Sequence, residues 1–133
     1  MFPKKITRPK RPSRVTLDKL LSKVVRMLAG GVCFICGREG SQACHIFSKK
    51  AYPKSRYDFR LNAIWGCFTC HKGGNHSMHE DPEWFRDWYD KKFGEGAMDN
   101  LKMIVSIRET TSEKLDPIMV KIELEQVLKD GKI

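Results

Sequence analysis

The sequence has no run of about 18 apolar residues, the minimum for a helix that crosses a bilayer, so we expect no membrane partner. Its first residues carry lysine, arginine and proline where a secretory signal would be apolar, and we therefore expect a cytoplasmic protein. Acidic residues are scarce: 16 Asp and Glu stand against 25 Lys and Arg, and the net charge of +9 favours a polyanionic partner. No internal repeat is present, and 133 residues fit one domain with extensions.

Cysteine is also infrequent, and four of the five cysteines form two Cys-x-x-Cys pairs, Cys33/Cys36 and Cys67/Cys70. Each such turn directs two thiolates to one ion, and two turns complete a tetrahedral zinc site. We therefore expect one structural Zn²⁺, whose binding supplies folding energy that the short polar segment between the pairs lacks. Free or redox-active cysteines are the alternative, but no βαβ pattern surrounds the pairs as in a thiol oxidoreductase.

Two short apolar runs lie between the cysteine pairs, at residues 43–47 and 61–65. The polar loop between them is rich in Lys, Arg, Pro and Ser, a pattern that predicts two strands of a hairpin. A helix beginning near residue 68 would be short or irregular, because Gly73 and Gly74 follow closely.

Three polar residues mark this segment: His45 on the first strand, Asn62 on the second and His71 after the last cysteine. In this order, residues 33–79 resemble the HNH nucleases, also called ββα-metal or His-Me finger endonucleases. The resemblance implies an α+β fold, with a small zinc-stapled ββα-metal module flanked by helices. It also implies catalytic roles: His45 as general base, Asn62 holding the base or its loop, and His71 as a ligand of a catalytic divalent ion.

The wider layout also looks like the phage recombination nucleases of the NinG (Rap) type. The features that carry this resemblance are the basic N-terminal region, the loop before Asn62 and the later aromatic helix that ends in Gly. That similarity implies a phage-encoded or bacterial protein that acts on branched or recombination-intermediate DNA. Symmetric cutting of a junction would favour a homodimer.

The expected metal shell departs from the family at one position. Many members place Asp or His before the base, and this sequence has Cys44 there. His79 is the expected extra ligand and His76 the second choice. Mg²⁺ or Mn²⁺ is the expected ion, and Mn²⁺, Ni²⁺ or Zn²⁺ suits two imidazoles better than Mg²⁺. The alternatives are a satisfied strand histidine at position 45, a turn residue at 62, and a zinc ligand at 71.

Basic residues gather in two places, residues 1–15, where Pro3, Pro9 and Pro12 disfavour a helix, and the loop between the strands. We expect a flexible basic arm and a basic loop that bind the DNA backbone, with solvated charges as the alternative. The expected DNA contacts are Lys4, Lys5, Arg8, Lys10, Arg11, Arg14, Lys49, Lys50, Arg56 and Arg60.

Helices are predicted on both sides of this module. Thr16 is the expected cap of a helix that ends at Gly30, and Asp81 with Pro82 begins another that ends at Gly94. A third helix covers residues 97–108. A last one follows Asp116, where a strand is the alternative. Residues 16–95 would form the nuclease domain and residues 96–133 a helical extension.

Together these patterns predict a metal-dependent DNA endonuclease that hydrolyses phosphodiester bonds. The alternative is a non-catalytic zinc-binding module that binds DNA or another protein. The histidine and asparagine triplet distinguishes the two hypotheses, because a binding module does not need it.

Overall fold

The computed structural model describes residues 9–133 and has an α+β fold. In chain order its elements are α1 (Arg14–Leu28), β1 (Gln42–His45), the 3₁₀ turn η1 (Pro53–Ser55), β2 (Ala63–Gly66), the π-helical turn η2 (Thr69–Gly73), α2 (Pro82–Phe93), α3 (Ala97–Thr111) and α4 (Pro117–Asp130). Within residues 9–133, no helix combines the length and the apolar character that crossing a membrane requires.

The two strands form an antiparallel pair, in which Gln42 lies opposite Gly66 and His45 opposite Ala63. This confirms the predicted hairpin, although the ladder ends at His45. Asn62 was expected on the second strand, but it directly precedes β2. Its carbonyl accepts from the Ile46 amide at 2.8 Å, and its side chain bonds the main chain of Phe47. The predicted irregularity after β2 is also confirmed, because the chain there forms only the short π-helical turn η2.

The first helix begins earlier than expected. Ser13 caps it, since its side chain accepts a hydrogen bond from the Thr16 amide, and Thr16 itself lies inside α1. The prediction of Thr16 as the cap was therefore wrong. Arg14 belongs to α1 and not to an extended arm.

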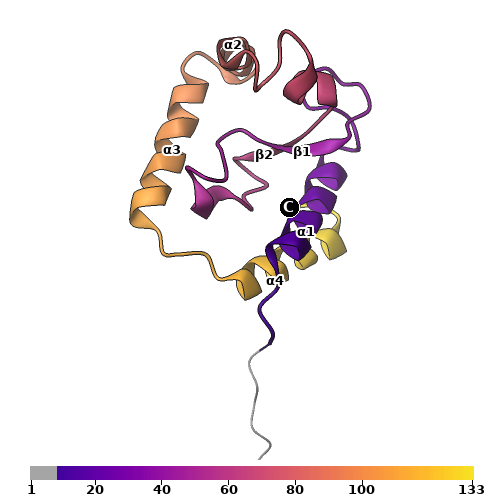
Figure 1. The fold of residues 1–133 in the computed structure, drawn as a ribbon, viewed down its shortest axis with the longest axis vertical. Helices are drawn as coiled ribbons and strands as arrows, with labels where there is room; N and C mark the ends of the chain where they lie inside the picture. The colour runs from indigo at the N-terminus through magenta and orange to yellow at the C-terminus, as the bar shows by residue number, and fades with distance from the viewer. Residues whose placement is uncertain (1–8) are drawn as a thin grey trace, which may run out of the picture.

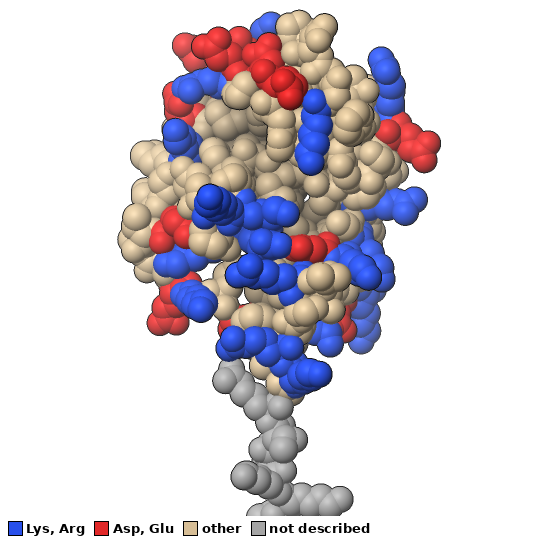
Figure 2. Space-filling model, viewed as in Figure 1, with Lys and Arg blue, Asp and Glu red and all other residues tan. Residues whose placement is uncertain are grey.

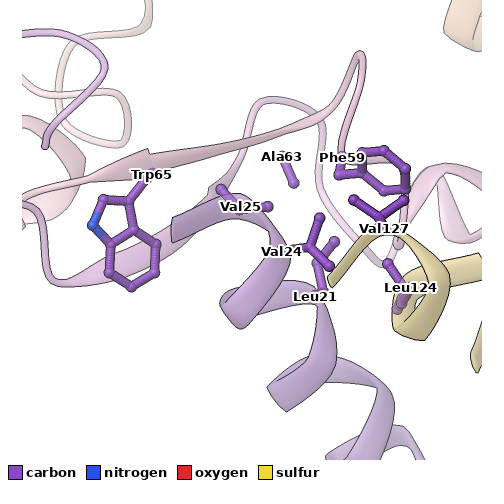
Figure 3. Close-up of a cluster of buried hydrophobic side chains, with 8 residues drawn as sticks. All are labelled: Leu21, Val24, Val25, Phe59, Ala63, Trp65, Leu124 and Val127. Carbon is purple, nitrogen blue, oxygen red and sulfur yellow. The ribbon is translucent and has the colours of Figure 1, made fainter. Parts of the chain in front are cut away.

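A hydrophobic cluster joins one face of the hairpin to α1 and α4 (Figure 3). Its buried members are Leu21, Val24, Val25, Phe59, Ala63, Trp65, Leu124 and Val127. Burying a side chain of this size contributes about 1.5–3 kcal/mol. Because Leu124 and Val127 complete the cluster, α4 is a helix with a core-facing stripe, and the strand alternative for this segment is excluded.

A second cluster covers the other face of the hairpin with α2 and α3, so that the hairpin lies between two pairs of helices (Figure 1). Its buried members are Cys44, Met78, Phe85, Met98, Leu101 and Val105. The expected ends of α2 are confirmed: Asp81 accepts from the Trp84 amide, and Gly94 follows the helix with φ of 113°. Residues 96–133 thus contribute buried side chains to both clusters.

Candidate functional site

The four paired cysteines converge on one point. Their sulfur atoms all lie within 4.8 Å of one another, and none of these cysteines is in a disulfide. The Sγ atoms of Cys36 and Cys67 are 3.8 Å apart. Four thiolates at about 2.3 Å from a tetrahedral Zn²⁺ would be separated by about 3.8 Å, so the cluster fits this ion. Among the described residues, these cysteines form the only group of three or more His, Cys, Asp or Glu donors close enough to share an ion.

Both cysteine turns are attached to β2, the first by a main-chain hydrogen bond and the second by direct connection along the chain. The Phe34 amide donates to the Trp65 carbonyl at 2.8 Å, and Cys67 follows β2 directly. Burial opposes ionisation of Cys33, but hydrogen bonds from nearby backbone amides outweigh it and lower its pKa to about 7. Burial raises the pKa of Cys70. The neighbouring cysteines raise it further, because another thiolate beside them is disfavoured without a cation. A bound Zn²⁺ would compensate these charges.

His45 lies at the end of β1 with its ring partly buried. Its Nε2 is 2.7 Å from the carbonyl oxygen of Arg56, and because a carbonyl only accepts, Nε2 carries the proton. The lone pair of the neutral ring is therefore on Nδ1. Burial lowers the pKa of His45 below its ordinary value, although the hydrogen bond to Arg56 opposes this shift. The structure thus keeps His45 neutral with one nitrogen fixed, which is what a general base requires.

Asn62 is fully buried, and its side chain makes three hydrogen bonds. Its Oδ1 accepts from the Phe47 amide at 2.7 Å, and its Nδ2 donates to the carbonyls of Phe47 and Ser55 at 3.2 and 3.0 Å. These bonds tie the segment after His45 to the loop that carries Arg56. Asn62 is therefore placed to position His45 through Phe47 and its ring partner through Ser55, and it is not a simple turn residue.

His71 and His79 form a pair of imidazoles next to the cysteine cluster. Their ring centroids are 4.5 Å apart with perpendicular planes, and the His79 amide donates to the His71 carbonyl at 3.1 Å. The Nδ1 atom of His71 is buried and has no hydrogen-bond partner among the described residues. Burial and the neighbouring His79 lower the pKa of His71 to about 4. A neutral imidazole with an unsatisfied buried nitrogen fits a metal ligand, because buried polar atoms normally have a partner.

His76 and Cys44 lie away from this pair. His76 is exposed, and its Nδ1 is 3.0 Å from a carboxylate oxygen of Asp81. Cys44 is wholly buried in the cluster beneath the hairpin, and burial raises the pKa of its thiol to about 12. Its sulfur occupies the space next to Gly66, where a Cβ atom would approach it to 2.7 Å. Gly66 is thus required for this close contact.

His45, His71 and His79 line one cleft of about 750 Å³ between β1, η2 and the first turns of α2 and α3. The sequence brought these three histidines into one segment, and the structure brings their side chains to one surface. Other residues of this cleft were not anticipated: Phe47, Tyr52, Lys72 and Lys102. Residues 47, 52 and 72 lie close in the sequence to His45 or His71, and this is the only signal that could have indicated them. Nothing in the sequence places Lys102 in the same cleft.

The predicted DNA contacts have different surroundings. Lys49 and Lys50 are exposed, and Lys49 lines the cleft. Arg56 makes a two-bond ion pair with Asp18 of α1, and Arg60 pairs with Glu123 of α4 at 2.8 Å. Lys10, Arg11 and Arg14 are exposed, whereas Lys4, Lys5 and Arg8 lie outside the described residues. Figure 2 shows Lys and Arg gathered over the middle and lower part of one face, with Asp and Glu concentrated at its upper edge near α2.

Searches of protein-family models, of curated proteins and of solved structures find no match to this chain.

Proposed function

We propose that the protein is a metal-dependent DNA endonuclease of the HNH class. The observation that carries this proposal is the cleft itself, where a partly buried, neutral His45 with a fixed tautomer shares one cleft with the imidazole pair of His71 and His79. A core histidine needs none of these neighbours. The exposed basic residues on the same molecule are suited to a polyanionic substrate.

In this proposal His45 accepts a proton from the attacking water. Its Nε2–H remains bonded to the Arg56 carbonyl, so Nδ1 is the nitrogen that takes the proton. Asn62 is a positioning residue, since it bonds the main chain of Phe47, two residues after His45, and of Ser55, next to the Arg56 that holds the His45 ring. It has no exposed surface that could contact substrate.

His71 and His79 would hold the catalytic divalent ion, with phosphate and water oxygens completing its shell. Such an ion, when bound, stabilises charge on the phosphoryl oxygens and on the leaving oxygen. Two imidazoles favour Mn²⁺ over Mg²⁺ as that ion. The four thiolates would hold a separate, structural Zn²⁺ that fixes His71 through its neighbour Cys70.

A panel of DNAs tests this function. The wild-type protein is incubated with branched, single-stranded and duplex DNA, with Mg²⁺ and Mn²⁺ in separate reactions. We expect cleavage, most readily of the branched DNA and with Mn²⁺. In His71→Ala, a higher Mn²⁺ concentration should partly restore the rate, because a metal ligand has been removed and the base remains.

His76→Ala is the matched control, since His76 is exposed and paired with Asp81 outside the cleft. It should cleave at the wild-type rate and require no additional Mn²⁺. If the wild-type protein cuts no DNA with any divalent ion, the non-catalytic zinc-binding module replaces the nuclease as the function.

A further inference from the structure

The cleft extends beyond the histidines into an apolar part that the proposed chemistry does not use. Met78, Phe85 and Met98 form its floor, and Phe47 and Tyr52 line it as well. A phosphate gains nothing from such a lining. Pockets of about 300–1,000 Å³ with apolar and aromatic walls and a few polar groups are typical sites for small organic ligands, and this cleft of about 750 Å³ falls in that range.

The aromatic pair in this part of the cleft is held rigidly. The Asn62 side chain fixes the main chain of Phe47 with two hydrogen bonds, and the Tyr52 amide donates to the Ser48 carbonyl at 2.9 Å. The ring centroids of Phe47 and Tyr52 are 5.4 Å apart, with an angle of 57° between the planes. Little conformational freedom would be lost if a planar ring packed against them.

Charge around the cleft favours an anionic ligand. Among the described residues that line it, four are cationic and one is a carboxylate; they are Lys49, Lys72, Arg86, Lys102 and Glu83. Arg86 is paired with Asp99, and the three lysines are exposed. An apolar aromatic floor with cations at the edge matches a nucleotide, which joins a planar base to a phosphate.

We propose that this part of the cleft is a subsite for one unpaired nucleobase of DNA. The inference rests on the proposed nuclease function and adds a substrate class to it. The base would pack against Phe47 and Tyr52, while the adjoining phosphate lies at the histidines, since Phe47 follows His45 by two residues. A base that is stacked within a continuous duplex cannot enter such a pocket, so the subsite selects DNA that already holds an unpaired base.

A binding experiment tests the subsite independently of cleavage. One duplex sequence is prepared in three forms: fully paired, with a single unpaired adenine, and with an abasic analogue at that same position. Affinities of the full-length protein are measured by fluorescence anisotropy without added Mg²⁺ or Mn²⁺. The unpaired adenine should bind about 5- to 150-fold more tightly than the abasic analogue, the range that one base stacked on an aromatic side chain provides.

Two variants locate the effect. Phe47→Leu and Tyr52→Leu keep an apolar side chain but remove a ring, and each should reduce the preference for the unpaired base over the abasic analogue. Phe93→Leu is the matched control, because Phe93 is also an aromatic residue, 51% exposed, but does not line the cleft. It should retain the wild-type preference. Zinc content and melting temperature, measured for all three, identify a variant that is misfolded.

The subsite is overturned if the wild type binds the adenine and abasic forms equally, if it binds none of the three DNAs, or if both cleft variants keep the full preference. Failure of the nuclease proposal looks different. Selective binding of the unpaired base without cleavage under any divalent ion would leave the subsite in place and remove the enzyme. Cleavage without discrimination between the adenine and abasic forms would support the nuclease and overturn the subsite.

Discussion

His45 owes its chemical state to burial and to one hydrogen-bond partner that is distant in the sequence. The carbonyl of Arg56 fixes the proton on Nε2, and the surrounding protein removes the ring from water. Desolvation disfavours the imidazolium, so the neutral form persists to lower pH than in a free histidine. Asn62 contributes indirectly, by bonding both Phe47 and the loop before Arg56.

The pH dependence of cleavage should reflect this environment. Only neutral His45 accepts a proton, and burial lowers its pKa below the ordinary value of 6.5. The midpoint of the pH profile should therefore lie below pH 6.5, and the rate should fall as the pH drops through it and the ring becomes protonated. Single-turnover rates between about pH 5 and 8 measure this profile. A midpoint above about pH 6.5, the pKa of a free imidazole, would contradict the assigned environment.

Among the elements, β2 connects the two cysteine turns, since Phe34 of the first turn bonds Trp65 and Cys67 of the second follows the strand directly. The second turn follows β2 and leads directly into His71, so the geometry of the cysteine cluster also sets the position of a cleft residue. With only two short strands, a hairpin of this kind is marginal without further support. The helices pack on both of its faces, and the thiolate cluster holds one end.

Zinc content should follow this arrangement. The purified protein should contain about one Zn²⁺ per chain, and Cys67→Ser should lose both the metal and the cooperative thermal transition, because structural zinc binding is coupled to folding. Elemental analysis and thermal melting by circular dichroism measure the two effects. Cys44→Ala is the control. Cys44 is buried but is not one of the four clustered cysteines, so this variant should retain its zinc. A zinc-free protein that melts like the wild type would disprove the structural role.

The elements differ in how well local sequence predicts them. α2 was predictable to its ends, because Asp81, Pro82 and Gly94 act within a few residues of the helix. Thr16 was mistaken for a cap because Ser13 and Thr16 are both suited to that position, and only the helix geometry decides between them. The cysteine cluster followed from spacing. The pairing of Arg56 with Asp18 and of Arg60 with Glu123 depends on contacts between distant segments, which no local pattern records.

At the scale of the whole molecule, ion pairs divide the predicted DNA contacts into two groups. Arg56 and Arg60 connect the loop to α1 and α4, whereas Lys49 and Lys50 are exposed. Lys54 has a similar connecting role, because its ammonium group donates to the Glu109 carbonyl near the end of α3. The loop therefore has a face that closes the fold and a face that is available to a polyanion.

Salt dependence of DNA binding tests whether the exposed lysines of the loop and the basic residues before α1 contact phosphates. A variant with Lys49→Gln and Lys50→Gln should bind duplex DNA more weakly, and its plot of log affinity against log salt should flatten by about 0.9 for each lost phosphate contact. Removing residues 1–12, which leaves the Ser13 cap of α1 in place, should have a similar effect if Lys4, Lys5, Arg8, Lys10 and Arg11 contact phosphates. Lys91→Gln on α2 is the control and should leave the slope unchanged. Slopes equal to that of the wild type in both altered proteins would mean that neither region contacts the DNA backbone.

The proposed role of His45 as the general base of the cleft is tested by comparing the wild type with His45→Ala. Single-turnover cleavage of a branched DNA with Mn²⁺ is measured for the wild type and for His45→Ala, at matched zinc content and saturating protein. We expect a rate lower by about 10²–10⁴-fold in the variant, the usual contribution of a general base, with melting temperature and DNA affinity nearly unchanged. Cleavage by His45→Ala at the wild-type rate would contradict it.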